Sequence, residues 1–376
     1  MGFLRAFLAI SVLIAHAREI FSTHGVVWNS IISRENTHIY PWSGHAVFAF
    51  FIISGFYMSM VINEKYSKLE NGKIKFISNR LLRLYPVNFV LIALYFIFYM
   101  ATGTKSFLVF NDPNQTVFMT IVAYFCNLFY LGAEIIPFSN ESNWSYVIGP
   151  VWSLSLELYF YLLAPFIVTK KIKYIAIMAV AGLAIRIAME MNNIPLTPWR
   201  YFFFPSDFVF FILGVISYRT KDFKLKIKGI GLITMIRWAS LASLILMLFN
   251  EYFWSISGNI DSYSSWAFYA CVAISSPLLF EITKNSKIDN YIGQLSYPIY
   301  ISHMLAIALV YYFTRDGIDR GAASLIVTLS ISVMLFHFID KPIESIRRKI
   351  AKNNKGEKNN DLQGKIIVNQ GIIKDA

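Results

Sequence analysis

Repeated apolar stretches of about twenty residues constrain the fold of this sequence more than any other feature. A transmembrane helix needs about 20 consecutive, mostly apolar residues, so a chain with this pattern is expected to fold in a lipid bilayer. The composition agrees, since 56% of the 376 residues are hydrophobic and only 15% are charged, against about 25% charged in an average soluble domain. We therefore predict an all-α integral membrane protein in which 1–345 forms one polytopic bundle. The apolar stretches lie near 3–21, 44–62, 84–102, 116–132, 150–169, 174–190, 201–218, 229–250, 266–283, 292–314 and 321–340.

The distribution of Lys and Arg decides how many of these stretches cross the membrane. If the amino terminus is cytoplasmic and 116–132 does not cross, the cytoplasmic segments hold 26 Lys and Arg residues and the outer loops hold 7. If 116–132 does cross, 11 lie inside and 22 outside, which contradicts the positive-inside rule. The same argument applies to 84–102 and 150–169, but 116–132 is short and contains Asn127. The sequence thus predicts about ten crossings, one re-entrant or interfacial segment and two cytoplasmic termini.

The two ends of the chain are interpreted from their charges. A short basic start precedes the first apolar stretch, as in a secretion signal, but no convincing cleavage site follows, so we expect a retained helix. Residues 346–376 are basic and mostly polar, which predicts a disordered cytoplasmic tail near anionic headgroups. Topology then accounts for the net charge of +12, and we expect no nucleic-acid partner. We also expect no appended extracytoplasmic domain, so that the membrane part binds the acceptor itself.

Two ionisable residues, Arg5 and His16, interrupt the first apolar stretch, FLRAFLAISVLIAHAREI. Eleven residues make nearly three helical turns, so both side chains share one face, roughly 16 Å apart along the axis. Arg5 falls at the cytoplasmic edge and His16 past the bilayer middle. An ionisable group at that depth costs about 2.5–3.5 kcal/mol and usually faces a cavity or a partner. His16 is either a neutral ring bonded to a carbonyl or a functional group, and its position favours function.

A second basic cluster, Arg80 and Arg83, lies in KIKFISNRLLRLYP. Residues three apart share a helix face, and guanidinium groups suit phosphate recognition. Positive-inside anchoring is the simpler interpretation of the pair alone. Arg5 would join it from the first helix, and three arginines at one membrane edge favour a polyphosphate ligand such as a nucleotide-bearing coenzyme.

A carboxylate, Glu157, interrupts the apolar segment VWSLSLELYFYLLAP. Ser153 and Tyr161 lie four residues to either side, so a polar stripe runs along one side of this helix. His16 is a candidate partner, because a carboxylate can hold an imidazole in the orientation that a general base needs. A structural bond between helices is the alternative.

Three further features concern packing and helix ends. Ser54 and Gly55 form a small-residue patch where helices can approach closely. His303 is a second deep histidine, which either pairs with a carboxylate or completes a buried network. The sequence Asp340-Lys341-Pro342 predicts the end of the last helix.

Cys126 and Cys271 both lie in apolar runs and are interpreted as packing residues rather than as a disulfide or a metal site. The sequence contains neither zinc-ligand spacing nor a Gly-rich phosphate loop. We therefore expect no metal and no permanently bound cofactor.

Five ordered motifs resemble those of the acyltransferase 3 family, membrane-bound enzymes that O-acylate bacterial surface and secreted glycans. The resemblance covers about 1–345 and rests on the Arg5–His16 spacing and on FFIISGF, RLLRLYP, WSLSLE and LSYPIYISHM. Phe48 stands where the second-helix motif often carries a polar residue, and many members append a hydrolase-like domain. The resemblance implies location in the bacterial inner membrane, His16 as the essential catalytic residue and acyl-CoA as the co-substrate, bound by Arg5, Arg80 and Arg83. The supporting residues within these motifs are Ser54, Tyr85, Trp152, Ser153, Tyr161, Tyr300 and His303.

The expected reaction is transfer of an acyl group, most simply acetyl, from cytoplasmic acyl-CoA to a hydroxyl of a cell-surface or lipid-linked glycan. His16, oriented by Glu157, would act as general base. A covalent acyl-enzyme on Ser or Tyr stays open. The rival classes are a proton-coupled transporter or flippase, which also uses intramembrane histidines and carboxylates, and a glycan polymerase or ligase that uses no CoA.

Overall fold

The computed structural model describes residues 1–21, 43–103, 117–138, 148–223, 226–227, 230–250, 253, 260–314 and 320–348. Within these residues the chain is helical, apart from turns and one antiparallel pair of two-residue strands, β1 (Lys226–Ile227) and β2 (Ile230–Gly231). Seven helical segments of the described chain are long and apolar enough to cross a membrane, and three shorter apolar helices accompany them. The predicted class of helical membrane protein agrees with this finding, while the number of ten crossings stays a prediction.

The helices follow one another along the whole described chain. The main helices are α1 (Gly2–Phe21), α3 (Ser43–Glu64), α4 (Gly72–Thr102), α5 (Val117–Phe129), α6 (Val151–Ile167), α7 (Ile172–Met191), α8 (Phe204–Arg219), α9 (Leu232–Leu248), α11 (Tyr263–Thr283), α12 (Lys287–Phe313) and α13 (Arg320–Leu335). Four short helical turns join them: η1 (Tyr66–Lys68), η3 (Ala133–Phe138), η4 (Leu196–Arg200) and η5 (Phe336–Asp340).

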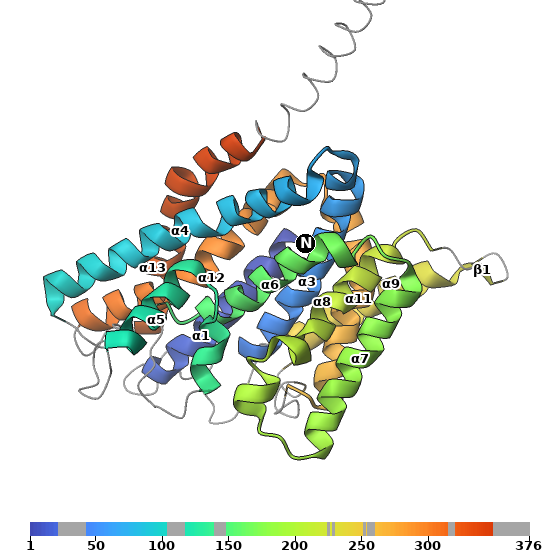
Figure 1. Cartoon of the computed structure of the whole chain (residues 1–376), viewed down its shortest axis with the longest axis horizontal. Helices are drawn as coiled ribbons and strands as arrows, with labels where there is room; N and C mark the ends of the chain where they lie inside the picture. Colours follow the sequence, from blue (N-terminus) through green and yellow to red (C-terminus); the bar gives the residue numbers. More distant parts are fainter. Residues whose placement is uncertain are drawn as a thin grey trace, which may run out of the picture.

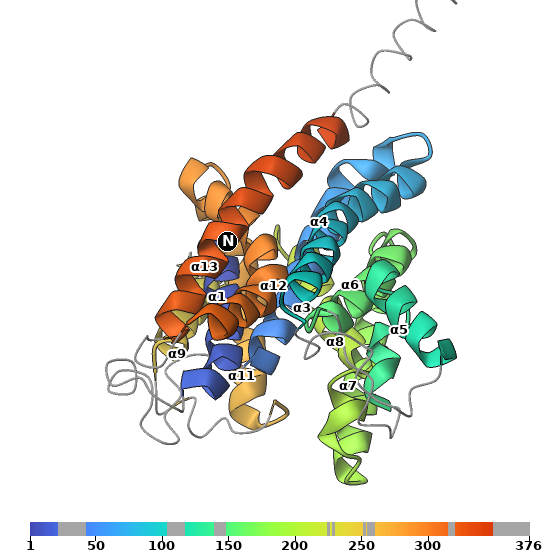
Figure 2. The same ribbon diagram turned by 90° about the vertical axis from the view of Figure 1, so that its left-hand side faces the viewer.

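The helices pack around α3. Helix α3 lies against α8, α1 and α11, while α1 also packs against α12 and α13. Figure 1 shows α4 running along the upper side of the bundle, and Figure 2 shows α1, α12 and α13 on one side with α5, α6 and α7 on the other.

Close contact between α3 and α8 depends on two glycines. A Cβ atom on Gly55 would lie 2.0 Å from the carbonyl oxygen of Phe211, and one on Gly214 would lie 1.9 Å from that of Ile52. No side chain fits at these distances, so glycine lets the two backbones touch, as small residues do in membrane helix pairs. The prediction that the Ser54-Gly55 patch permits close approach is confirmed for Gly55.

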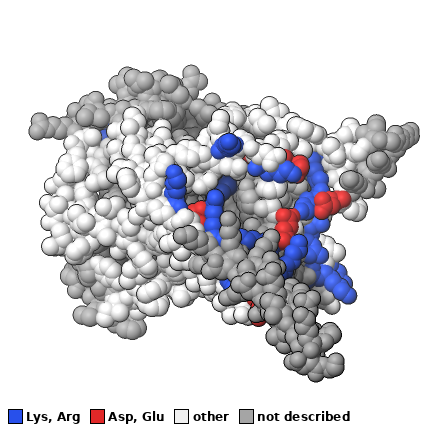
Figure 3. All heavy atoms as spheres, turned by 90° about the horizontal axis from the view of Figure 1, so that it is seen from above, with Lys and Arg blue, Asp and Glu red and all other residues white. Residues whose placement is uncertain are grey.

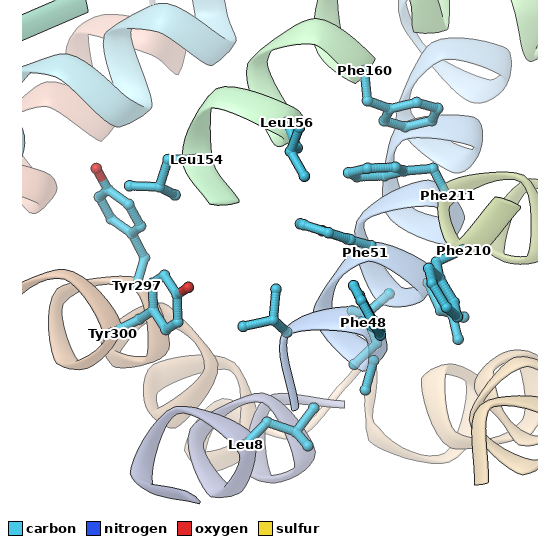
Figure 4. Packing of buried hydrophobic residues seen from close by; sticks show 14 of the residues in the cluster. Leu8, Phe48, Phe51, Leu154, Leu156, Phe160, Phe210, Phe211, Tyr297 and Tyr300 are labelled. Atoms are coloured by element: carbon cyan, nitrogen blue, oxygen red, sulfur yellow. The ribbon is translucent and has the colours of Figure 1, made fainter. Parts of the chain in front are cut away.

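Aromatic rings fill the interior beside these glycines. The Phe48 and Phe210 rings stack with centroids 4.3 Å apart, and the Phe211 ring lies 4.4 Å from Phe51 and 4.5 Å from Phe160. Figure 4 shows these rings between α3, α6 and α8. Such pairs add about 0.5–1.5 kcal/mol beyond the burial of their area. Phe48, which replaces a residue that is often polar in the resembling family, is thus part of the packed interior.

Helix α5 has 13 residues, a length of about 20 Å. The hydrocarbon core of a bilayer is about 30 Å thick. Residues 104–116 before α5 lie outside the described residues, so the non-crossing of the stretch 116–132 stays a prediction.

The last helix does not end at Asp340-Lys341-Pro342 as the sequence predicted. After the π-helical turn η5, in which the Lys341 amide donates to the Phe336 carbonyl, a helix continues to Arg348. A wider turn moves the preceding carbonyls away from a proline ring, so the clash that normally stops a helix is relieved. Residues 346–348 of the predicted tail belong to this helix, and 349–376 lie outside the described residues.

Candidate active site

A cavity of about 560 Å³ lies between α1, α3, α4, α6, α12 and the helix that follows η5. Figure 3 looks onto the side of the molecule where Lys and Arg gather over one region, with acidic side chains among them. Eight residues that the sequence singled out line this cavity together: Arg5, Ser54, Arg80, Arg83, Ser153, Glu157, Tyr161 and Tyr300.

The three predicted arginines meet here from two helices. Arg80 is 6% exposed, and its Nε has no hydrogen-bond partner. Among the residues that the structure describes, the guanidinium groups of Arg5, Arg80 and Arg83 form no ion pair and donate no hydrogen bond, although Arg5 lies 5.8 Å from the centre of the Tyr57 ring. Buried charges without partners are costly, and like charges raise that cost. The cluster is therefore suited to a ligand with several negative charges.

The position of Arg5 is set by a carboxylate of α12. Asp289 accepts hydrogen bonds from the backbone amides of Gly2 at 2.8 Å and Phe3 at 2.9 Å. These amides have no partner within their own helix, so Asp289 fixes the start of α1 against α12. Arg5 follows within one turn and points into the cavity that α12 also lines.

Glu157 stands in the middle of the polar stripe that the sequence predicted. Its Oε1 accepts hydrogen bonds from Ser54 Oγ at 2.8 Å and from the Tyr161 hydroxyl. The described hydrogen bonds of this carboxylate thus join α6 to α3, which is the helix-to-helix bond considered as the alternative. A contact between Glu157 and His16 is not among them.

His16 and His303 stack on each other outside the cavity lining, and His16 is exposed while His303 is buried. The His16 and His303 rings have centroids 5.3 Å apart at an angle of 28°. His303 is fully buried, its Nδ1 lies 2.6 Å from the Tyr300 carbonyl oxygen, and its Nε2 has no hydrogen-bond partner. A carbonyl can only accept, so Nδ1 carries the proton and Nε2 is a free acceptor.

Tyr300 links the cavity lining to the histidine pair. Its hydroxyl is 2.6 Å from Ser153 Oγ, and both residues line the cavity. The Tyr300 and His303 ring centroids are 6.2 Å apart. The stacked histidines therefore adjoin a residue of the cavity wall.

Two predicted supporting residues are placed elsewhere. The Tyr85 hydroxyl donates to the Phe129 carbonyl at 2.8 Å, which ties α4 to the end of α5. The Trp152 ring packs on Tyr201 and Phe202, with centroids 4.8 and 4.6 Å apart. Neither is among the described residues that line the cavity, and both have packing roles.

Several cavity residues were missed by sequence reasoning. Asp340, Glu344 and Arg347 reach the cavity from η5 and the helix after it, and Arg348 lines it as well. Their spacing of four and three residues places them on one helical face, a signal that was available in the sequence. Because the helix was expected to stop at Pro342, this face was assigned to the tail. Within the described residues, no group of three or more His, Cys, Asp or Glu side chains is arranged to hold a metal ion.

The described residues form a helical protein of membrane type with a cavity lined by several arginines. The acyltransferase domain family (acyltransferase 3) matches residues 1–337, so the chain belongs to this family, and the resemblance seen in the sequence is confirmed. The chain is similar to an uncharacterized protein of Aquifex aeolicus, with 23% identity over 219 residues, 57% of this chain and 95% of that protein.

A second relative carries a functional name. The chain is 23% identical over 369 residues to the O-acetyltransferase OatA of Staphylococcus aureus, which covers 90% of this chain and 56% of that protein. The chain therefore spans little more than half the length of this relative. No solved structure matches the chain.

Proposed function

We propose that this protein transfers an acyl group, expected to be acetyl, from acyl-CoA to a hydroxyl of a cell-surface or lipid-linked glycan. Membership of the family supports acyl transfer, and the relative named O-acetyltransferase supports oxygen as the acceptor atom. The donor assignment depends on one observation, the three guanidinium groups that line one cavity without ion-pair partners in the described chain. CoA carries a diphosphate and a 3′-phosphate, and guanidinium forks are well suited to such groups.

The orientation in the membrane follows from charge. Lys and Arg gather around the part of the surface seen in Figure 3, and cytoplasmic surfaces of membrane proteins are rich in these residues. We place this face on the cytoplasmic side of the bacterial inner membrane. Acyl-CoA then enters the cavity from the compartment that contains it.

The donor would lie in the cavity with its phosphates on the arginines and its pantetheine arm directed toward Ser153 and Tyr300. The helical spacing of Arg5 and His16, roughly 16 Å, is one that this arm can span. His16 and His303 do not line the described cavity, so the proposal requires that the thioester reach His16 past the end of the cavity that Tyr300 and Ser153 line.

In the proposed step, a ring nitrogen of His16 removes the proton from the acceptor hydroxyl. The oxygen attacks the thioester carbonyl, the carbon–sulfur bond breaks, and the CoA thiolate takes the proton from the imidazolium. General-base catalysis contributes about 10²–10⁴-fold. A covalent intermediate on Ser153 or Tyr300, whose hydroxyls adjoin in the cavity, is the alternative route, and single-turnover labelling with radioactive acetyl-CoA distinguishes the two.

The test is thiol release from acetyl-CoA by the purified protein in lipid nanodiscs, with and without a glycan acceptor. We expect release that depends on the acceptor and is lost in His16→Ala, while binding of CoA to that variant is retained. A transporter, a flippase or a glycan polymerase releases no thiol. Full activity of a well-folded His16→Ala would remove the assignment of the base.

A further inference from the structure

We infer that Arg347 recognises the 3′-phosphate of the acyl-CoA donor; this inference rests on the proposed function. Arg347 lies beyond residue 337, where the family match ends. It nevertheless lines the same cavity as Arg5, Arg80 and Arg83. The chain therefore adds a fourth guanidinium group to the donor site from a segment outside the matched domain.

The guanidinium group of Arg347 is held in a fixed position at the cavity wall. Its Nε and Nη2 donate to Asn79 Oδ1 at 3.0 and 2.6 Å, and its Nη1 donates to Glu344 at 2.9 Å. Asn79 directly precedes Arg80 on α4, so these bonds tie the last helix to the helix that carries two of the phosphate-binding arginines. A guanidinium group has five N–H donors, and the bonds described here use three of them.

Arg347 lines the cavity, and its ion-pair partner Glu344 is partly exposed. The Arg347 side chain is 13% exposed, whereas that of Glu344 is 36% exposed. A carboxylate so exposed is solvated and contributes at most about 1 kcal/mol as an ion-pair partner. A phosphate with two negative charges is a stronger acceptor and replaces Glu344 on Nη1 without disturbing the bonds to Asn79.

The exposure of the arginines leaves Arg347 available for the last phosphate to enter. Arg80 is 6% exposed as a residue, while the side chains of Arg347 and Arg348 are 13% and 72% exposed. An acyl-CoA that enters acyl group first brings its diphosphate in next and its 3′-phosphate last. We therefore assign the diphosphate to the cluster that contains the buried Arg80 and the 3′-phosphate to Arg347.

Arg348, which also lines the cavity, is the comparison residue for the fixed geometry of Arg347. It is the next residue in the same helix and donates to the same Glu344 side chain at 3.1 Å, but its guanidinium group is largely exposed. Replacing either residue removes one positive charge from the same turn. Only Arg347 has the fixed geometry that phosphate recognition requires.

The experiment compares acetyl-CoA with 3′-dephospho-acetyl-CoA as donors for the full chain in nanodiscs of zwitterionic lipid. Hydrogen bonds to a charged group are worth about 10–100-fold in binding, so we expect the wild-type KM for acetyl-CoA to be lower than that for the dephospho donor by about this factor. In Arg347→Ala the KM for acetyl-CoA should rise to that for the dephospho donor with kcat unchanged, and the KM for the dephospho donor should stay constant. Arg348→Ala should keep most of the wild-type preference.

The outcomes separate this inference from the proposed function. If the wild type uses neither donor, the proposed function fails. If it uses both, and Arg347→Ala changes both KM values equally or neither, the assignment of Arg347 is overturned while acyl-CoA remains the donor. A loss of preference in Arg348→Ala alone overturns it as well. Arg347→Lys is measured alongside: partial preference supports a charge that faces the 3′-phosphate, and it replaces the alanine variant if that variant does not fold.

Discussion

Two regions of this molecule contain buried arginines, and they differ in whether the arginines form ion pairs. Between α7, α8 and the start of α11, Arg186 pairs with Asp207 at 2.7 Å and with Asp261 at 2.6 Å, and Arg200 pairs with Asp261 at 3.0 Å. In the cavity, the guanidinium groups of Arg5 and Arg80 have no carboxylate partner among the described residues. In the first region each arginine has a carboxylate within 4 Å, whereas in the cavity Glu157 acts on Arg5 and Arg80 only from a longer distance. The cavity therefore leaves room for a bound anion.

The difference teaches how to distinguish structural from functional charge in a membrane protein. Arg186 also lies over the Phe48 and Phe210 rings, at 5.2 and 4.9 Å from their centres, so every side of its guanidinium group is occupied. A charge satisfied in this way holds helices together. A buried charge left unsatisfied implies a ligand, because the fold would otherwise retain its full desolvation cost.

The largest expected effect is on stability, in the paired region. Arg186→Ala leaves the buried carboxylates of Asp207 and Asp261 without their main partner, which should lower the free energy of unfolding by about 3–5 kcal/mol. Thermal unfolding in detergent, followed by tryptophan fluorescence, measures this loss. The exposed Arg348→Ala is the control and should unfold with the wild type. A wild-type melting temperature for Arg186→Ala would contradict the comparison.

The second effect is stabilisation of the unpaired region by ligand. If CoA supplies the missing anion, wild-type protein should gain about 2.7 kcal/mol of stability at a CoA concentration of 100 times Kd. The rise in melting temperature should be absent in Arg80→Ala. An equal rise in both proteins would show that CoA binds elsewhere.

Removing single arginines from the cavity should weaken donor binding without destabilising the fold. We expect Arg83→Ala to raise the KM for acetyl-CoA by about 10–100-fold, since it deletes hydrogen bonds to a charged ligand. Its melting temperature without ligand should equal or exceed that of the wild type, because one repulsive charge is gone. Steady-state kinetics measures the KM, and thermal unfolding measures the melting temperature. A strongly destabilised Arg83→Ala would mean that Arg83 has a structural role, as Arg186 does.

The smallest effect is expected at the cavity mouth. Glu344→Gln removes a carboxylate that shares Arg347 with the incoming phosphate and should lower the KM for acetyl-CoA by less than about five-fold, as expected for an exposed ion pair. The same kinetic assay measures it at two salt concentrations, and the difference should shrink as salt increases. A higher KM at low salt would mean that Glu344 assists donor binding.

The sequence predicted the arginine cluster because helical periodicity fixes which residues share a face. Arg80 and Arg83 are one turn apart, and Arg5 occupies the corresponding edge of another span. All three arginines are therefore expected at the same depth in the bilayer. The lengths of the apolar stretches predicted the helices for a similar reason, since bilayer thickness sets a common scale.

Contacts between segments that are distant in the sequence could not be predicted from helical periodicity. The shared face of Arg5 and His16 suggested one common passage, but periodicity does not tell which neighbouring helix covers that face. His303 of α12 lies there, so His16 stacks on His303 and does not line the described cavity. The ion pairs of Arg186 were beyond the same reasoning, because Asp207 and Asp261 come from other segments.

The π-helical turn η5 has a geometric consequence for everything that follows it. A π-turn inserts one residue relative to a regular helix, and each residue advances the helix by about 100°. Deleting one residue from 336–340 would therefore rotate Arg347 by more than a quarter of a turn, away from Asn79. A single extra residue in this turn thus sets the direction in which the following segment presents its side chains.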